Sequence, residues 1–432
     1  MTTKVKMVRM VKWLKDFMAK RIILLIVAII LYRQVVPLAN LVKNFPLNDF
    51  SVYIDGTKAT LNGENPYKLK FFDRYNYSPA TTLFFLPLAA APTELSEWLF
   101  TVLSVVSLWL TVSMTLRILN FDRSSPSSQA ERSVVEGSRG SLVIKWLIFT
   151  LCLKMFPVKL TLALGQINLI VLALIVGSYY FVTIRKKDTV SGILFGLATI
   201  LKLTPAPILI YFLIRKKWKV VNWYVFTFAF LTVMGGFVFG WDLTKYYFVS
   251  VVPGLMGEVT KETVNASYMN QSITALIARF GVFGNLNSAI RLGISFILGV
   301  RAIRIIKIIK TGTTRNDFID FWHLTIIVLL FLPVFVWQHH YTILIPVWIV
   351  LIAKFIQTKK FKDLAIVGLT YFLLIFYIKD PYLPLQLNPF LSSHFLTSGL
   401  IFLILNLKSF SSNQNQIPNG KKLLKQNSGS GF

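Results

Sequence analysis

Hydrophobic and polar positions alternate along this chain in long blocks. Apolar runs such as 98–119 and 220–239 exceed the roughly 18 residues that indicate a membrane-spanning segment. Because lipid offers no hydrogen-bond partners, the backbone of such a run must satisfy itself, and a helix does this within one segment. The pattern predicts an all-α, polytopic integral membrane protein with about twelve transmembrane helices and large extracytoplasmic loops.

Two of the expected membrane segments depart from a simple crossing. The run 81–92 is short and contains prolines, which predicts a re-entrant or interfacial segment. The run 190–214 lies between two basic clusters and is interrupted by the sequence KLTP, which starts at Lys202. We expect it to form a hairpin of two short helices with Lys202 near the outer tip. The other expected spans are 21–41, 98–119, 142–157, 168–184, 220–239, 289–306, 318–337, 343–356, 364–378 and 395–407.

The charge distribution predicts the orientation in the membrane. The chain carries 46 Lys and Arg against 18 Asp and Glu, a formal net charge of +28. Nucleic-acid binding is one explanation of this excess, but the bases lie in short segments between apolar runs, where the positive-inside rule explains them better. We predict a multi-pass plasma-membrane protein with no nucleic-acid partner. Its segments 48–79 and 241–270 are expected to be extracytoplasmic, and both termini cytoplasmic.

The expected domain organisation is simple. Residues 1–410 are predicted to form one transmembrane domain. Residues 411–432, rich in Asn, Ser and Lys, are expected to form a disordered cytoplasmic tail. The single cysteine, Cys152, lies in an apolar run and excludes an intramolecular disulfide.

Candidate chemistry begins in the segment 48–79, an acidic and Tyr-rich stretch that reads as a long polar loop. Asp49 is the first acid after the first expected span, close to the membrane boundary, and is the candidate general base. Asp55 is the reserve candidate. If the stretch were helical, the spacing of six residues would put the two acids on different faces. The alternative is that both are ordinary solvated charges.

A membrane-depth lysine and a histidine pair are the candidate phosphate ligands. A cation at Lys202 within an apolar context is costly, and such a residue is a functional hypothesis by default. Snorkelling to the interface is the alternative. His339 and His340 end a span beside Trp337 and Tyr341, which suits phosphate binding, proton exchange or an interfacial aromatic belt. No carboxylate lies near them in the sequence, so no metal site is predicted.

Two amide side chains are further candidates on the expected outer face of the membrane. Gln166 and Asn168 form a polar turn and offer the donors and acceptors that sugar hydroxyls need. The predicted topology brings them to the same membrane face as Asp49, Lys202 and the His pair.

An ordered set of short motifs runs through the chain. It comprises Asp49-Phe-Ser-Val-Tyr53, Asn62-Gly-Glu-Asn-Pro66-Tyr67, Tyr77-Ser-Pro79, Gly165-Gln-Ile-Asn168, Gly196-Leu-Ala-Thr-Ile-Leu-Lys202-Leu-Thr-Pro205, Asn270-Gln-Ser272 with Arg279, and Trp337-Gln-His339-His340. With this set the chain resembles glycosyltransferase family 87, the polyprenol-phosphate-mannose-dependent mannosyltransferases of the GT-C superfamily.

The resemblance implies a GT-C fold and an inverting transfer of a hexosyl group, expected to be mannosyl, at the outer membrane face. The donor is then a sugar on a polyprenyl phosphate, the acceptor a lipid or a glycan, and no cofactor is implied. The family's catalytic acid maps onto Asp49. The expected donor-phosphate ligands are Lys202, His339, His340 and Arg279. The expected substrate-binding residues are Tyr53, Tyr67, Tyr77, Gln166, Asn168, Asn270 and Gln271.

Three points stay open on the sequence. Gln338 interrupts the family's Trp-His-His element, so either His339 or His340 can take its role. Family members use mannose or arabinofuranose, so the sugar is also open. A transporter or flippase for lipid-linked saccharides would use the same outer groups, but it needs polar residues deep in several spans, and few are found.

Overall fold

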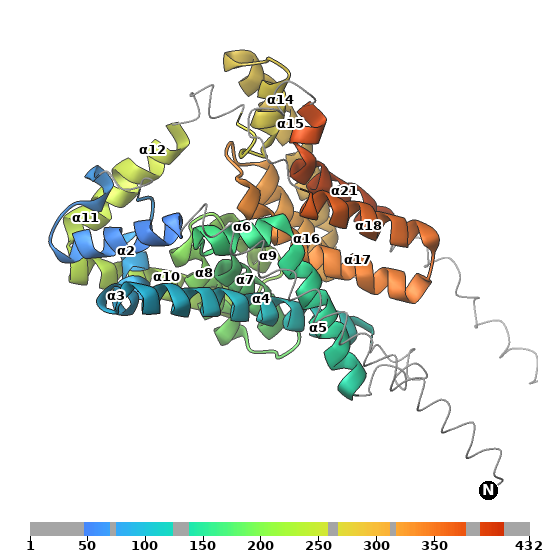
Figure 1. Cartoon of the computed structure of the whole chain (residues 1–432), viewed down its shortest axis with the longest axis horizontal. Coiled ribbons are helices and arrows are strands. Elements are labelled where there is room, and N and C mark those ends of the chain that lie inside the picture. Colours follow the sequence, from blue (N-terminus) through green and yellow to red (C-terminus); the bar gives the residue numbers. More distant parts are fainter. Residues whose placement is uncertain are drawn as a thin grey trace, which may run out of the picture.

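The computed structural model describes residues 47–69, 75–123, 138–257, 267–311, 317–376 and 389–409. Within these ranges the chain is built from helices, and the strand-like pairing they contain is an isolated bridge between Asn270 and Trp337 (Figure 1). The all-α membrane fold is therefore confirmed. The expected first span 21–41 and the tail 411–432 lie outside the described residues.

Three helical segments in the described part are long and apolar enough to cross a membrane, namely Thr93–Leu119, Trp218–Phe239 and Gln338–Ile356. Leu142–Lys154 and Phe156–Leu164 make a further pair, bent by 71° at Met155. Shorter apolar helices include Asn168–Thr183 and Asp188–Leu201. The count of twelve spans stays a prediction.

The N-terminal half forms a helical bundle centred on the helices α7 and α8. Its elements are α2 (Asn48–Leu61), η1 (Pro66–Lys68), α3 (Pro79–Ala90), α4 (Thr93–Arg123), α5 (Ser138–Lys154), α6 (Phe156–Leu164), α7 (Asn168–Thr183), α8 (Asp188–Leu201), η3 (Ala206–Ile208), α9 (Leu209–Ile214), α10 (Trp218–Phe239), α11 (Trp241–Tyr246), η4 (Tyr247–Val251) and α12 (Val252–Gly257). Helix α8 packs between α7 and α10, α4 packs on α7, and α3 joins α10 to α2.

The C-terminal half of the chain packs against this N-terminal bundle (Figure 1). Its elements are α14 (Ile273–Arg279), α15 (Gly284–Thr311), α16 (Asp317–Ile326), η6 (Ile327–Phe331), η7 (Gln338–Leu344), α17 (Ile345–Thr358), α18 (Phe361–Ile375), α20 (Pro389–Ser392) and α21 (His394–Ser409). The 3₁₀ segment η7 contacts both α6 and α7, and α17 contacts α4. These contacts bring the His339–His340 segment to the N-terminal bundle.

The predicted hairpin over 190–214 is confirmed. Helix α8 ends at Leu201, and Lys202 has an extended backbone with φ −151° and ψ 119°. The Thr81 hydroxyl donates to the Ile200 carbonyl at 2.6 Å and so satisfies one carbonyl that the helix end leaves without an intrahelical donor. Pro205 cannot continue α8, so the chain turns and resumes in α9.

The polar loop expected from Asn48 onward is wrong for residues 48–61, which form helix α2. Phe50, Tyr53, Ile54 and Thr57 recur at helical spacing and are buried on one face of it. Asp49 in the first turn also favours the helix, because a negative charge interacts well with the N-terminal end of the helix dipole. The expected loop 241–270 is likewise helical over 241–257.

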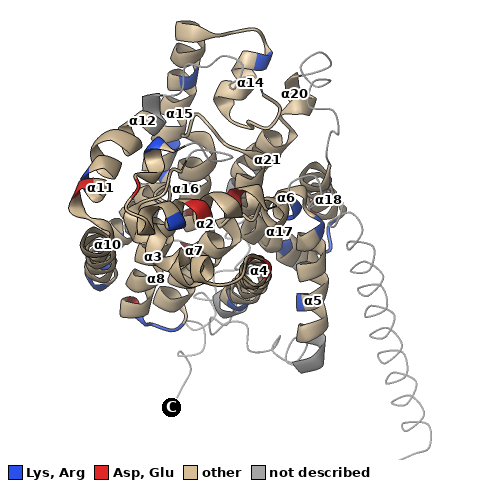
Figure 2. Cartoon of the chain, turned by 60° about the vertical axis from the view of Figure 1, so that its left-hand side comes forward, with Lys and Arg blue, Asp and Glu red and all other residues tan. Residues whose placement is uncertain are grey.

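Basic residues gather at the loop before α8 and at the start of α10 (Figure 2). Figure 2 shows acidic residues on α2 and α11, away from the basic residues at the loop before α8 and at the start of α10. Lys186 and Lys187 precede the first residue of α8, and Lys202, which belongs to the predicted site, follows its last. The basic clusters and the predicted site therefore lie at opposite ends of the same helices.

Candidate active site

The end of α6 and the start of α2 approach each other closely enough to place Gln166 beside Asp49. Gly165 ends α6 with a left-handed φ of +65°. A Cβ atom there would lie 2.5 Å from the Cβ of Phe50. The Leu47 amide donates to the Ala163 carbonyl at 3.0 Å and ties the two helix ends together. Only glycine permits both this conformation and this approach.

A chain of hydrogen bonds holds the Asp49 carboxylate. The Gln166 side-chain amide donates from Nε2 to Oδ2 of Asp49. Gln166 in turn accepts at Oε1 from the Tyr53 hydroxyl at 3.2 Å, and that hydroxyl accepts from the Tyr77 hydroxyl at 3.1 Å. Tyr53 is buried, so it positions Gln166 instead of presenting a surface to a ligand. This series of hydrogen bonds fixes the orientation of Asp49, the candidate base.

Lys202 joins this group from the tip of the α8–α9 hairpin. Its Nζ atom donates to Oδ1 of Asn168 at 2.7 Å and lies 3.0 Å from Nε2 of His340. The opposite charges of Lys202 and Asp49 also interact. The sequence-predicted set Asp49, Gln166, Asn168, Lys202 and His340 is thus assembled from four separate segments of the chain.

The two histidines have different surroundings. An ammonium group only donates hydrogen bonds, so Nε2 of His340 accepts from Lys202, and the neutral ring carries its proton on Nδ1. His339 is buried, and its backbone carbonyl accepts from Asn168 at 3.4 Å and from the Thr342 hydroxyl at 3.2 Å. His340 is therefore the ring that meets the candidate phosphate ligand, while His339 holds the backbone beside it.

A mostly apolar cavity opens next to Lys202. Its polar groups include Asn168, Lys202 and His340, and its apolar walls include Val171 of α7 and Leu329 of η6. A cation and an amide beside apolar walls suit a ligand with a phosphate head and a hydrocarbon chain.

The tyrosines of the segment 48–79 pack against one another. The Tyr67 hydroxyl donates to the Tyr77 carbonyl at 2.7 Å, and its ring contacts those of Tyr75 and Tyr247. Burial, reinforced by these two phenols, raises the pKa of Tyr67, so its hydroxyl stays protonated and remains a donor. Tyr67 and Tyr77 are half-buried, and their contact with a substrate stays a prediction.

Asp55 does not join the site. It lies on α2, where its side chain is exposed, whereas that of Asp49 is half-buried. Six residues advance a helix by about 600°, so the two acids point in directions roughly 120° apart. The structure favours Asp49 over Asp55 as the candidate base.

Asn270, Gln271 and Arg279 form a separate cluster. The Arg279 guanidinium donates to the carbonyls of Ser267 and Asn270 at 2.8 and 2.5 Å and to the Ser393 hydroxyl at 2.6 Å. Asn270 accepts at Oδ1 from the Val336 amide at 3.1 Å, and the Gln271 amide donates to the Val336 carbonyl at 2.7 Å. These bonds fasten residues 267–272 to the strand-like segment that leads into His339. The geometry supports a positioning role, and ligand contact by these three residues stays a prediction.

Sequence reasoning missed Tyr75, which is buried and packs on Gly56, where a Cβ atom would lie 2.2 Å from the Tyr75 ring. It also missed the apolar walls beside Lys202. Gly56 in the middle of α2 indicated that another part of the chain approaches closely there, but a glycine does not show which residue approaches it.

Gly165→Ala is expected to disrupt the Asp49–Gln166 contact. The left-handed backbone costs about 1–2 kcal/mol for a residue with a Cβ, and the contact with Phe50 adds a steric cost. We expect a lower thermal unfolding midpoint and a fall in activity. Gly63→Ala is the control, because Gly63 has φ +77° but nothing within 4 Å of its Cβ position. Equal effects of the two substitutions would show that the close approach to Phe50 does not matter.

Comparison with known proteins places the chain in a family. The model of glycosyltransferase family 87 matches residues 75–376. Two curated relatives carry the name polyprenol-phosphate-mannose-dependent alpha-(1-2)-phosphatidylinositol mannoside mannosyltransferase. The one from Mycobacterium tuberculosis is 26% identical over 208 residues, which cover 46% of this chain and 47% of the relative. The one from Mycolicibacterium smegmatis is 25% identical over 243 residues, which cover 54% and 52%.

The chain spans about half the length of the curated relatives it matches. The family model, by contrast, covers most of the chain and includes Gln166, Asn168, Lys202 and the His pair. The resemblance seen in the sequence is thereby confirmed, and the chain belongs to glycosyltransferase family 87.

Proposed function

We propose that this protein is a membrane glycosyltransferase that moves a hexosyl group, mannosyl in the first instance, from a polyprenyl phosphate to a lipid or glycan acceptor with inversion. The observation that carries the proposal is the convergence of Asp49, Gln166, Lys202 and His340. A carboxylate and an ammonium group at one site provide a base for the acceptor and a cation for the phosphate. Membership of the family and the names of the relatives support the same reaction class.

The geometry suggests how the transfer proceeds. Asp49 takes the proton of the acceptor hydroxyl as its oxygen forms a bond to the anomeric carbon. The bond from that carbon to the phosphate oxygen breaks on the opposite face, and its electron pair stays on the leaving phosphate. Lys202 stabilises the charge that develops there, in a site with little water to screen the interaction. Attack opposite the leaving group inverts the anomeric configuration.

The position of the lipid chain follows from the apolar walls. With its phosphate at Lys202 and His340, a polyprenyl donor lays its first isoprene units along Val171 and Leu329. The acceptor then enters from the side of Tyr67 and Tyr77, next to Asp49. Gln166 and Asn168 are the proposed partners for hydroxyls of the transferred sugar, because each side chain offers both donors and an acceptor.

The decisive experiment uses membranes that contain the full chain. They are incubated with radiolabelled polyprenyl-phosphate mannose and extracted lipids, and the products are separated by chromatography. A labelled lipid or glycan with a new glycosidic bond supports the enzyme. Movement of intact donor across the vesicle membrane, with no new glycosidic bond, would instead identify a flippase. A polyprenyl-phosphate arabinofuranose arm tests the alternative sugar.

The proposal requires the site to be extracytoplasmic, and single cysteines test this in a Cys152→Ala background. Glu64 follows α2 in the segment that is expected to be extracytoplasmic and is exposed, and Lys187 is exposed at the end of α8 opposite Lys202. An impermeant thiol reagent applied to intact cells should label Glu64→Cys, and it should label Lys187→Cys only after permeabilisation. The reverse pattern would place the site in the cytoplasm and contradict the proposal.

A further inference from the structure

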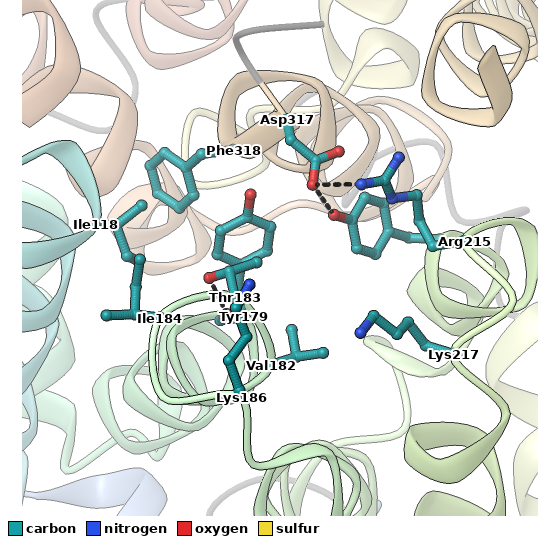
Figure 3. A pocket seen from close by; sticks show the side chains of 11 residues that line it. Ile118, Tyr179, Val182, Thr183, Ile184, Lys186, Arg215, Lys217, Asp317 and Phe318 are labelled. Atoms are coloured by element: carbon teal, nitrogen blue, oxygen red, sulfur yellow. Dashed lines mark hydrogen bonds and ion pairs between the residues drawn. The ribbon is translucent and has the colours of Figure 1, made fainter. Parts of the chain in front are cut away.

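A second pocket lies at the other end of α7 from the candidate active site. Helix α7 starts at Asn168 beside Lys202 and ends at Thr183, and its 16 residues span about 24 Å. The pocket, of about 270 Å³, is lined by the ends of α7 and α9 and the start of α16 (Figure 3). Small-molecule sites typically measure about 300–1,000 Å³, so its size suits a headgroup more than a whole substrate.

The pocket has two unlike sides. Arg215 and Lys217 stand on one side of the hollow, and Ile118, Ile184 and Phe318 stand opposite (Figure 3). An apolar wall facing cationic groups suits a ligand that has both a charged and an apolar part.

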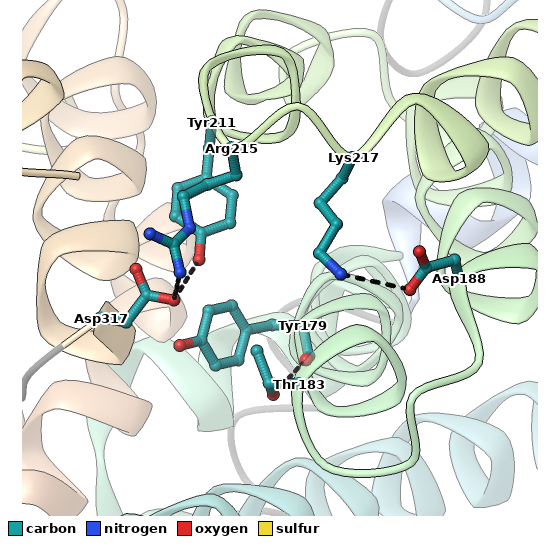
Figure 4. A network of polar contacts seen from close by, with 7 residues as sticks. All are labelled: Tyr179, Thr183, Asp188, Tyr211, Arg215, Lys217 and Asp317. Carbon is teal, nitrogen blue, oxygen red and sulfur yellow. Dashed lines mark hydrogen bonds and ion pairs between the residues drawn. The ribbon is translucent and has the colours of Figure 1, made fainter. Parts of the chain in front are cut away.

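Positive charge dominates the lining. Lys186, Arg215 and Lys217 are opposed there by one acid, Asp317. Arg215 lies 3.4 Å from Asp317, and Lys217 lies 3.6 Å from Asp188 outside the lining (Figure 4). Charge-assisted hydrogen bonds usually measure about 2.7–2.9 Å, so both ion pairs are loose. Their side chains are partly exposed, which leaves the cations accessible to an anion of higher charge density.

Residues with hydroxyl groups also line the pocket. The Tyr211 hydroxyl donates to Oδ2 of Asp317 at 2.8 Å, and the Thr183 hydroxyl donates to the Tyr179 carbonyl at 2.6 Å. The Tyr211 bond ties α9 to α16, while the ring of Tyr179 contacts that of Phe318 at 5.1 Å between centroids. The cations therefore sit on a scaffold assembled from three helices.

We propose that this pocket binds the phosphate of an anionic phospholipid, with Lys186, Arg215 and Lys217 as its ligands and the apolar wall against the lipid's glycerol and upper acyl region. Basic pockets between membrane helices at the cytoplasmic side bind anionic headgroups in this way. The pocket lies at the end of the bundle that carries the basic loops, where the positive-inside rule expects the cytoplasmic leaflet. The bound lipid would bridge α7, α9 and α16 and stabilise the bundle from the side opposite the candidate active site.

The first test measures lipid binding to the full chain purified in an uncharged detergent. The thermal unfolding midpoint is followed as phosphatidylglycerol, phosphatidylcholine or inorganic phosphate is added. We expect a saturable rise with phosphatidylglycerol alone. Equal rises with both lipids, or a rise with millimolar inorganic phosphate that matches phosphatidylglycerol, would overturn the assignment to an anionic lipid.

The second test compares two double variants that remove the same charge. Lys186→Ala with Lys217→Ala alters the pocket, whereas Lys187→Ala with Lys216→Ala alters neighbouring lysines that do not line it. The pairs are matched in backbone, because Lys186 and Lys216 have left-handed φ values of 54° and 52°. We expect the pocket pair to weaken phosphatidylglycerol binding about tenfold or more and the control pair by about twofold or less. Equal weakening would indicate attraction to the whole basic surface and would overturn the site.

A third variant is expected to strengthen phosphatidylglycerol binding, where the pocket double variant weakens it. Asp317→Asn keeps a carbonyl oxygen for the Tyr211 hydroxyl but removes the carboxylate that opposes the phosphate and engages Arg215. Phosphatidylglycerol should bind several-fold more tightly. A general folding defect cannot tighten binding, so weaker binding by this variant would contradict a phosphate in this position.

Discussion

Asp49→Asn is expected to reduce kcat by about a hundred- to ten-thousandfold, the usual cost of losing a general base. Asparagine keeps the size of the side chain and can still accept a hydrogen bond from Gln166, but it cannot take a proton from the acceptor hydroxyl. The measurement is transfer of labelled sugar by purified protein in vesicles at saturating donor. The expected signature is a fall in kcat with little change in the KM for the donor.

Asp55→Asn is the matched control, because it is the same substitution on the exposed face of the same helix. It should retain near-normal turnover. Loss of activity in Asp55→Asn together with normal turnover in Asp49→Asn would move the base to Asp55. Normal turnover in both would exclude an α2 carboxylate from the chemistry.

Lys202→Met is expected to reduce kcat with a polyprenyl-phosphate donor by about a hundred- to a thousandfold. Methionine fills most of the same volume but cannot stabilise the charge that develops on the leaving phosphate, and a single positioned donor in an active site is worth this much. Lys202→Arg should recover part of the rate, since a guanidinium is also cationic but does not match the contact with His340 at 3.0 Å. Donor titrations in reconstituted vesicles measure both variants.

The control for this prediction is Lys159→Met, which removes a positive charge from a half-buried position of α6 outside the Lys202 cluster. Its donor kinetics should stay close to those of the wild type. Unchanged kinetics in Lys202→Met would remove this residue from the donor site. Equal losses in both variants would indicate that general positive charge matters and not the Lys202 contact.

Much of the fold class was readable from local properties of the chain. The length and hydropathy of an apolar run depend only on neighbouring residues, so runs such as 98–119 and 220–239 predicted α4 and α10 directly. The break at Lys202 was also local, because Pro205 cannot continue a helix. The prediction failed at α2, where a helix with one buried stripe and many polar residues was taken for a loop.

Hydropathy and motifs in the sequence were enough to identify an all-α membrane protein and to name Asp49, Gln166, Asn168, Lys202 and the His pair as candidates. How these residues meet became visible in the three-dimensional structure. Gln166 reaches Asp49 across 117 positions, and Lys202 reaches His340 across 138. Such contacts depend on the path of the whole backbone, on close approaches such as that of Gly165 to Phe50, and on the direction of each side chain. For the same reason, the structure alone separated Arg279 from the Lys202 group and singled out His340 from His339.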